Sequence, residues 1–201
     1  MSNAESVLSF WYGAWPYDES VAAQQTATWF TSDPKLDQEI TDKFEALVIE
    51  HLNTTEMNIR FQSKSQLEDA LATILLLDQF TRNIYRGSAK AFAGDEKALN
   101  LCLSLLDQNQ IDSLPLHVAV FACMPLQHSE SPEIQSVSIK TFEDLVALHG
   151  EAAQGFANFA HKHKHIIDQF GRYPHRNQVL GRVSTDEELA YLNTNGERFG
   201  Q

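Results

Sequence analysis

The chain has few of the features that mark membrane, secreted or disulfide-bonded proteins. Its only cysteines, Cys102 and Cys123, lie among apolar neighbours, and we interpret both as reduced core residues. The longest apolar runs, residues 70–77 and 118–126, fall well short of the ~20 residues that span a bilayer. Residues 1–10 lack the basic start and long apolar run of a secretory signal. These absences predict a soluble, cytoplasmic protein that makes no membrane contact.

Positive charge is also scarce, and the common catalytic fingerprints are missing. The chain has 15 Lys and Arg against 27 Asp and Glu, which gives a formal net charge of -12. Nucleic-acid binding needs many basic groups on one face, so the composition argues against a nucleic-acid partner. We find no nucleophile motif, phosphate-binding loop, metal-ligand set or cofactor fingerprint. The sequence therefore indicates no metal and no cofactor, and it leaves open whether the protein is an enzyme.

The spacing of apolar residues predicts an all-α fold. No segment shows the sustained alternation of a half-buried strand, whereas helical spacing recurs along the chain. At 201 residues and 43% hydrophobic, residues 1–201 can form a single domain around one core. Short connections predict antiparallel helix pairs in a tetratricopeptide-like array. Residues 1–31 are too aromatic for a tail, and we expect them to lie across the first helices.

Start and stop signals place the helices. Asp33–Pro34 and Ser131–Pro132 are typical N-termini, and Gly171 is a typical C-terminal stop. We expect Pro125 to end one helix, and Ser184 with Glu187 to form the capping box of the last one. The predicted helices cover about residues 34–52, 65–86, 95–106, 115–124, 132–149, 152–170 and 185–192.

A locally basic segment stands out in this acidic chain. Residues 171–182, GRYPHRNQVLGR, contain Arg172, Arg176 and Arg182, and no carboxylate occurs between Asp168 and Asp186. Arg82 and Arg86 form a second short cluster. Such clusters either recognise an anionic ligand or neutralise carboxylates and helix ends buried elsewhere in the fold.

A charged pair is expected on an otherwise apolar helix face. Asp78 and Arg82 are i, i+4 partners in line with Leu67, Leu71 and Ile74. The string DQFTR at residues 78–82 recurs as DQFGR at residues 168–172. Two such helix ends facing one another would bring both arginines into one cleft; the alternative is a coincidence of helix-end composition.

Helical phase separates three neighbouring histidines. Phe156, Phe159 and His163 follow one stripe, so His163 is predicted to be buried, either as a structural histidine or as a catalytic candidate. His161 and His165 have a metal-chelating i, i+4 spacing but point away from that stripe, so we do not predict a metal site there.

Two more candidates lie just before a helix start. His128 and Glu130 occur in PLQHSE, residues 125–130. A histidine beside a carboxylate can act as a general base, and a helix N-terminus favours an anion. The alternative is that Glu130 complements the helix dipole and His128 is a loop residue.

Together these motifs resemble the bacterial protein family of unknown function 924. The resemblance rests on LLLDQFTRNIYRGSAKAF, MPLQHSE, FGRYPHRNQVLGR, STDEELAYL and the opening VLSFWYG, and it covers nearly the whole chain. It implies a wholly helical fold similar to tetratricopeptide arrays, in bacterial cytoplasm, with no assigned reaction. The matching positions are Asp78, Gln79, Phe80, Arg82, Asn83, Arg86, His128, Glu130, Gln135, His163, Arg172, His175, Arg176, Asn177, Gly181 and Arg182. Tyr173 stands where the family usually has Phe.

Two functional hypotheses follow from the motifs. In the first, a small anionic ligand, phosphorylated or not, lies in one polar cleft, with hydrolytic chemistry as an extension. The proposed ligand-binding residues are Asp78, Arg82, Asn83, Arg86, Arg172, His175, Arg176 and Asn177, and the catalytic candidates are His128, Glu130 and His163. In the second, the chain is a helical scaffold for a protein or peptide, and the same motifs only lock helices together.

Overall fold

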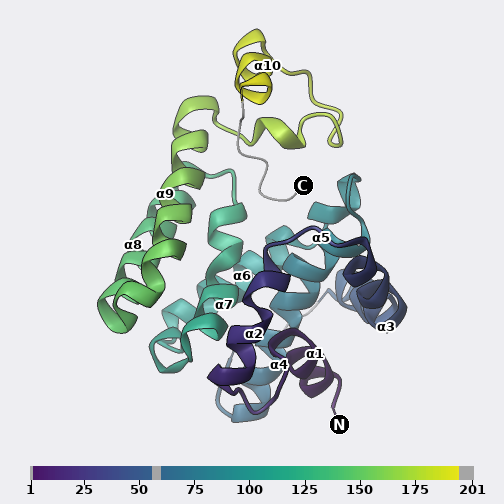
Figure 1. Ribbon diagram of the computed structural model, residues 1–201, viewed down its shortest axis with the longest axis vertical. Coiled ribbons are helices and arrows are strands. Elements are labelled where there is room, and N and C mark those ends of the chain that lie inside the picture. The colour runs from purple at the N-terminus through teal and green to yellow at the C-terminus, as the bar shows by residue number, and fades with distance from the viewer. Residues whose placement is uncertain (1, 56–59, 195–201) are drawn as a thin grey trace.

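Helices make up the regular structure of residues 2–55 and 60–194, which the computed structural model describes (Figure 1). The α-helices are α1 (Asn3–Tyr12), α2 (Glu19–Trp29), α3 (Pro34–Asn53), α4 (Lys64–Ile74), α5 (Thr81–Ile84), α6 (Asp95–Asp107), α7 (Leu116–His128), α8 (Pro132–His149), α9 (Glu151–Phe170) and α10 (Asp186–Asn193). Shorter helical turns are the π-helical η1 (Leu75–Phe80) and the 3₁₀ turns η2 (Ala89–Phe92), η3 (Ile111–Ser113) and η4 (Pro174–Arg176). Those ranges contain no strand, which confirms the all-α prediction.

The aromatic N-terminal segment forms α1 and α2, and both pack on later helices. Val7, Leu8 and Trp11 of α1 are buried. Trp29 Nε1 donates a hydrogen bond to the Trp11 carbonyl at 2.8 Å, and the Trp29 ring meets the Phe121 ring of α7 edge-on at 5.0 Å. In Figure 1 these two helices, in purple, lie over α4 and α7. This aromatic cluster brings the end of α2 next to α7 and α9.

Helix α3 begins at the predicted cap. Asp33 Oδ1 accepts a hydrogen bond from the Lys35 amide at 2.9 Å, and Pro34 occupies the first turn. Ile40 and Val48 of the predicted stripe are buried, so this face holds α3 against α5 and η1.

The predicted helix from about residue 65 begins at Lys64 and changes its winding partway. Residues 75–80 form the wide π-helical turn η1 before α5 resumes the α-helix. The Thr81 hydroxyl donates to the Leu77 carbonyl at 2.8 Å. Gly94 packs on this turn so closely that a Cβ there would lie 2.2 Å from the Leu77 carbonyl oxygen. The close approach fixes the start of α6 beside Asp78.

Pro125 does not end its helix as the sequence predicted. Helix α7 continues through it to His128, so Pro125 lies inside the helix. Leu126 and Gln127 beyond it are buried, and Gln135 Nε2 donates to the Gln127 carbonyl at 2.9 Å. Packing and this bond from α8 outweigh the backbone hydrogen bond that a proline removes.

Helices α8 and α9 form a long hairpin beside α7 (Figure 1). Ser131 caps α8, and Gly150, with a φ of +66°, is the one residue between α8 and α9. Because each connection is short, α8 runs antiparallel to both neighbours, and α7 and α9 run in the same direction. That these pairs form a tetratricopeptide-like array stays a prediction.

The last helix begins one residue later than predicted. Thr185 and Glu188 form the capping box of α10, whereas Ser184 accepts a hydrogen bond from Asn177 Nδ2 at 3.0 Å. The Ser184–Glu187 box was wrong because Glu188 is the buried carboxylate, held by neighbours outside the helix. Below α10, Ile166, Ile167 and Tyr173 form a small second core. Within the described ranges, no helix is long and apolar enough to cross a membrane.

Candidate functional site

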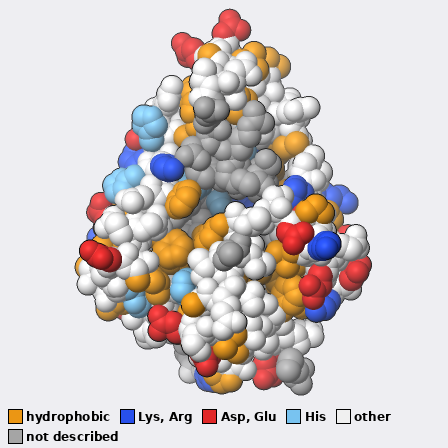
Figure 2. Space-filling model, viewed as in Figure 1, with side chains coloured by type: hydrophobic (Ala, Val, Ile, Leu, Met, Phe, Trp, Pro, Cys, Tyr) orange, Lys and Arg blue, Asp and Glu red, His pale blue; other side chains and the backbone are white. Residues whose placement is uncertain are grey.

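A pocket of about 320 Å³ lies between the end of α2 and elements α5, α7, α9 and η4. This volume is at the lower end of the range for small-molecule pockets, about 300–1,000 Å³. Figure 2 shows hydrophobic side chains beside a hollow near the centre of one face. The lining residues are Trp29, Phe30, Thr31, Ser32, Gln79, Arg82, Asn83, Arg86, Met124, Gln127, His128, Phe156, Phe159, His163, His175 and Arg176.

The pocket has an apolar end and a polar end. Met124 comes before His128 on α7, and Phe156 comes before His163 on α9. The two helices run in the same direction, so their polar residues meet: the His128 and His163 rings lie 6.1 Å apart. At the other end, the Phe156 ring lies 6.2 Å from His117 at the start of α7. The arrangement suits a molecule with one polar and one apolar part.

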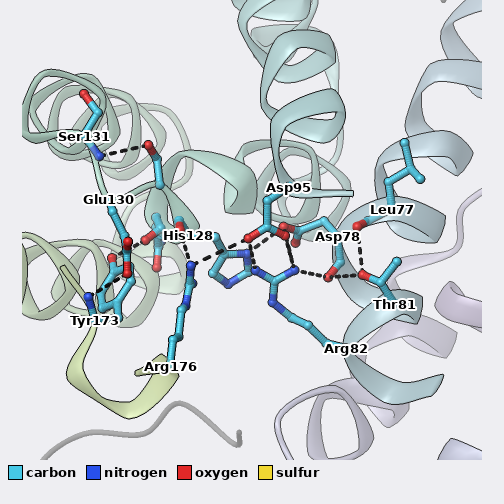
Figure 3. A network of polar contacts seen from close by, with 12 residues as sticks. Leu77, Asp78, Thr81, Arg82, Asp95, His128, Glu130, Ser131, Tyr173 and Arg176 are labelled. Carbon is cyan, nitrogen blue, oxygen red and sulfur yellow. Dashed lines mark hydrogen bonds and ion pairs between the residues drawn. The ribbon is translucent and has the colours of Figure 1, made fainter. Parts of the chain in front are cut away.

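A chain of alternating charges lies behind the polar end (Figure 3). Arg82 binds both carboxylate oxygens of Asp95, at 2.8 and 3.0 Å, and lies 3.3 Å from Asp78. Arg176 Nη1 lies 3.7 Å from the same Asp95. Both arginine side chains are only 8% exposed. Water solvates them little, so the neighbouring carboxylates must stabilise their charges. Two carboxylates and two guanidinium groups cancel in formal charge.

His128 is held by Asp78, fifty residues earlier in the chain. His128 Nδ1 lies 2.7 Å from Asp78 Oδ1. Burial alone would raise the pKa of the Asp78 carboxyl, but the charge of Arg82 and the hydrogen bond from His128 outweigh it and keep the pKa below its ordinary value. Burial and Arg82 lower the pKa of His128 below its ordinary value. A neutral imidazole beside a carboxylate donates from Nδ1, so Nε2 carries the lone pair.

The other two pocket histidines are also neutral. Burial lowers the pKa of His163 to about 3, with a further contribution from the Arg176 charge. His163 Nδ1 lies 2.8 Å from the Phe159 carbonyl of the preceding turn. Burial and the Arg176 charge lower the pKa of His175 to about 3. The prediction that His163 is buried is confirmed.

Arg176 is the pocket arginine that donates no hydrogen bond to a described carboxylate. Its guanidinium carbon lies 4.7 Å from the centre of the Phe92 ring and 4.5 Å from that of Tyr173. Nη1 donates to the His128 carbonyl at 3.0 Å, no described residue accepts a hydrogen bond from Nη2, and Nε is enclosed by the protein without an acceptor. Burial and Arg82 lower the pKa of Arg176 to about 10, so the group stays cationic at neutral pH. The rings fix the guanidinium plane without using its donors.

Arg86 and Asn83 line the pocket but bind a carboxylate of the protein. Arg86 Nε and Nη2 donate to the two oxygens of Asp37 at 2.8 and 3.0 Å. Asn83 Nδ2 donates to Asp37 as well, at 2.8 Å. These contacts tie α5 to the first turn of α3.

Arg172 and Asn177 lie outside the pocket. Arg172 forms two hydrogen bonds with Glu188 of α10, at 2.7 and 2.9 Å. Asn177 Nδ2 donates to the same carboxylate at 3.1 Å. The two DQF motifs therefore do not bring their arginines into one cleft, because Arg172 binds α10 and Arg82 binds α6.

Glu130 is not the partner of His128. Its carboxylate accepts two hydrogen bonds from Arg182, at 2.6 and 3.0 Å, and one from the Tyr173 amide at 2.8 Å. Glu130 does not line the pocket. It fixes the turn that carries Arg176, so its contribution to the site is indirect.

Several residues of the site were not anticipated from the sequence. Asp95 looked like a helix start, and its role as the partner of Arg82 depends on the close packing of Gly94 against η1. The aromatic stripe of α9, with Phe156 and Phe159, was visible in the sequence but was assigned to the core. The unanticipated pocket residues are Trp29, Phe30, Thr31, Ser32, Gln79, Met124, Gln127, Phe156 and Phe159.

The outer histidines of α9 show no metal-binding arrangement. His161 and His165 are exposed, and His161 lies 3.4 Å from Glu143 of α8. Among the residues that the structure describes, no group of three or more His, Cys, Asp or Glu could hold a metal ion.

Comparison with known proteins supports the fold and the family. No curated protein matches the chain. A solved structure of a protein of unknown function from Agrobacterium tumefaciens, ATU0120, is similar with a TM-score of 0.74 and 27% sequence identity, covering 96% of this chain and 97% of that one. The family model described as a bacterial protein of unknown function, DUF924, matches residues 7–196. The chain therefore belongs to the DUF924 family of bacterial proteins.

Proposed function

We propose that the protein binds a small organic monoanion, with its anionic group on Arg176 and its apolar part among the aromatic residues of the pocket. The observation that carries this proposal is the state of the Arg176 guanidinium. It is 94% buried by relative surface area, lines the pocket, and gives only one of its hydrogen bonds to the protein. A buried guanidinium with unused donors favours an oxyanion, since each fork can donate two parallel hydrogen bonds.

The hydrogen-bond pattern of the pocket arginines supports a monoanion such as a carboxylate. Arg82 and Arg86 each already bind a carboxylate of the protein through two hydrogen bonds, whereas Arg176 lies 3.7 Å from Asp95 and donates no hydrogen bond to a described carboxylate. A dianionic phosphate would need a second positive charge. The neutral His128, His163 and His175 could supply it only by taking up protons against the cost of burial.

The apolar end supports an aromatic or aliphatic tail. Phe30 and Phe159 both line the pocket and are 53% and 46% exposed, so their rings offer apolar surface on which a ligand can pack. Trp29, Met124 and Phe156 continue this wall. An apolar tail of a few carbon atoms would bury surface against these residues, and this burial adds to the affinity of the anionic group.

Contacts of this kind give four other arginines a structural role. Arg82, Arg86, Arg172 and Arg182 each bind one carboxylate with two hydrogen bonds and join separate elements. This favours the part of the scaffold hypothesis in which arginine motifs lock the helices together. In our proposal that role and the Arg176 pocket coexist.

Isothermal titration calorimetry with benzoate, hexanoate and phenyl phosphate tests the proposal. We expect the wild-type protein to bind the two carboxylates more tightly than phenyl phosphate at pH 7. Arg176→Met should weaken carboxylate binding roughly 10- to 100-fold, the value of a charge-assisted hydrogen-bonded pair. Arg172→Met is the matched control, because Arg172 comes from the same segment but lies outside the pocket. Equal affinity in both variants, or no binding at millimolar concentration, would overturn the proposal.

A further inference from the structure

The polar end of the pocket contains an imidazole arranged as a base. Asp78, with no exposed surface, accepts the Nδ1 hydrogen of His128 at 2.7 Å. Among the described residues none hydrogen-bonds His128 Nε2, and His128 lines the pocket. Figure 3 shows its ring between the guanidinium groups of Arg82 and Arg176. A carboxylate that fixes the tautomer and a second nitrogen that accepts a proton are the requirements for a general base.

The nucleophile for this base is water. In the described part of the chain no hydroxyl or thiol is hydrogen-bonded to His128, and the pocket hydroxyls, Thr31 and Ser32, follow α2 beside the aromatic end. A covalent mechanism would need a side-chain nucleophile within hydrogen-bond distance of the imidazole. The arrangement instead suits activation of a water molecule between His128 Nε2 and a bound carbonyl carbon.

We propose that the pocket hydrolyses esters of small apolar carboxylic acids, with His128 as the general base. His128 Nε2 takes one proton from water while the water oxygen bonds to the acyl carbon, and the carbonyl electrons move onto the carbonyl oxygen. The tetrahedral anion then re-forms its carbonyl and expels the alkoxide, which receives the proton held by His128. The products are an alcohol and a carboxylic acid that ionises at neutral pH, so the reaction consumes only ester and water.

Two pocket residues are placed to stabilise the tetrahedral anion. Arg176 offers donors that no described residue uses, and its Nη1 donates to the backbone carbonyl of His128 itself, at 3.0 Å. The Gln127 side chain precedes His128, is 4% exposed and lines the pocket, and no described residue hydrogen-bonds its amide group. Donors aimed at a developing oxyanion are a large part of catalysis by enzymes of this kind.

This inference rests on the proposed function, because the carboxylate product is the monoanion that the pocket is proposed to bind. It goes further in requiring proton transfer by His128, whereas binding requires only Arg176 and the apolar wall. The two ideas can therefore fail separately.

The test measures release of p-nitrophenol from p-nitrophenyl butyrate by purified protein at pH 7. We expect the wild-type protein and His165→Asn to react equally and faster than buffer. His165 is the matched control, since it is an exposed histidine outside the pocket. His128→Asn, which keeps a donor for Asp78 but has no base, should lose at least about 100-fold in rate. Imidazole added to His128→Ala should restore part of the rate, which a purely structural role of His128 would not produce.

The outcomes separate the two proposals. Wild-type protein that binds benzoate but releases no p-nitrophenol above buffer would overturn the hydrolysis proposal and leave the binding proposal intact. Folded His128→Asn with the wild-type rate would show that the activity arises elsewhere. A wild-type protein that binds no carboxylate would overturn the proposed function, and with it the hydrolysis proposal that rests on it.

Discussion

Replacing Asp95 with Asn gives a direct measure of the charge balance behind the pocket. Asp95 accepts two hydrogen bonds from Arg82, at 2.8 and 3.0 Å, and lies 3.7 Å from Arg176. The amide has nearly the same shape but carries no charge. The variant therefore leaves two buried guanidinium groups with Asp78 as their remaining carboxylate in the ion chain. We expect lower stability and tighter anion binding in the same variant.

The size of both effects follows from the geometry. Removing one partner of a buried ion pair costs about 3–5 kcal/mol, and the 23% exposure of the Asp95 side chain places the loss near the lower value. For a chain of this size that corresponds to a fall in Tm of roughly 6–12 °C. An anion on the far side of Arg176 would lie roughly 8 Å from Asp95. Removing that repulsion, at an effective dielectric constant of ~20, favours binding by up to about 2 kcal/mol, or roughly tenfold after screening.

Thermal unfolding followed by circular dichroism, with benzoate titrations by calorimetry, measures both quantities. Asp107→Asn is the control, because Asp107 is exposed at the other end of the same helix. We expect the control to change neither quantity appreciably. Unchanged stability of Asp95→Asn, or weaker benzoate binding, would refute the reasoning that Asp95 balances the charge of Arg82 and Arg176.

Two further predictions concern packing and pH. Gly94→Ala should destabilise the fold by at least about 2 kcal/mol in urea unfolding, because its Cβ would lie 2.2 Å from the Leu77 carbonyl oxygen; an unchanged midpoint would contradict the close contact. His163 and His175 have pKa values of about 3, below the ordinary 6.5, so the unfolded chain binds more protons between these values. The free energy of unfolding should therefore fall as pH drops from 7 to 5, by up to about 1.4 kcal/mol per pH unit for each histidine. Urea unfolding of a double His→Gln variant should show a weaker pH dependence, and an equal one would show that these histidines do not cause the loss.

Capping and stop residues in the sequence predicted helix ends correctly where tertiary contacts do not override them. Asp33 caps α3, Ser131 caps α8 and Gly171 follows the end of α9, as expected. The two errors have tertiary causes. Helix α7 passes through Pro125 because the residues beyond it are buried against α8. The last helix starts at Thr185 because buried contacts select Glu188 as the capping carboxylate.

The candidate site was only partly visible in the sequence, because partners of buried charges are chosen by the fold. Asp78, Arg82, Arg176 and His128 were all predicted as site residues, but His128 was paired with the neighbouring Glu130, whereas the acid that orients it is Asp78, fifty residues earlier. Asp95, thirteen residues after Arg82, reaches it only because α6 starts directly on η1. The segment around Arg172 looked uniform in sequence, yet only its central part faces the pocket. Whether a residue of this segment lines the pocket or binds α10 depends on which element lies next to it, and residue type alone does not predict this.

The most direct test of the central claim is a crystal structure with 4-bromobenzoate, whose bromine can be located by anomalous scattering. We predict the carboxylate on the Arg176 guanidinium beside His128, and the bromine among Phe30, Phe156 and Phe159. A ligand bound outside this pocket, or one whose bromine lies at Arg176 with its carboxylate toward the aromatic wall, would contradict the account.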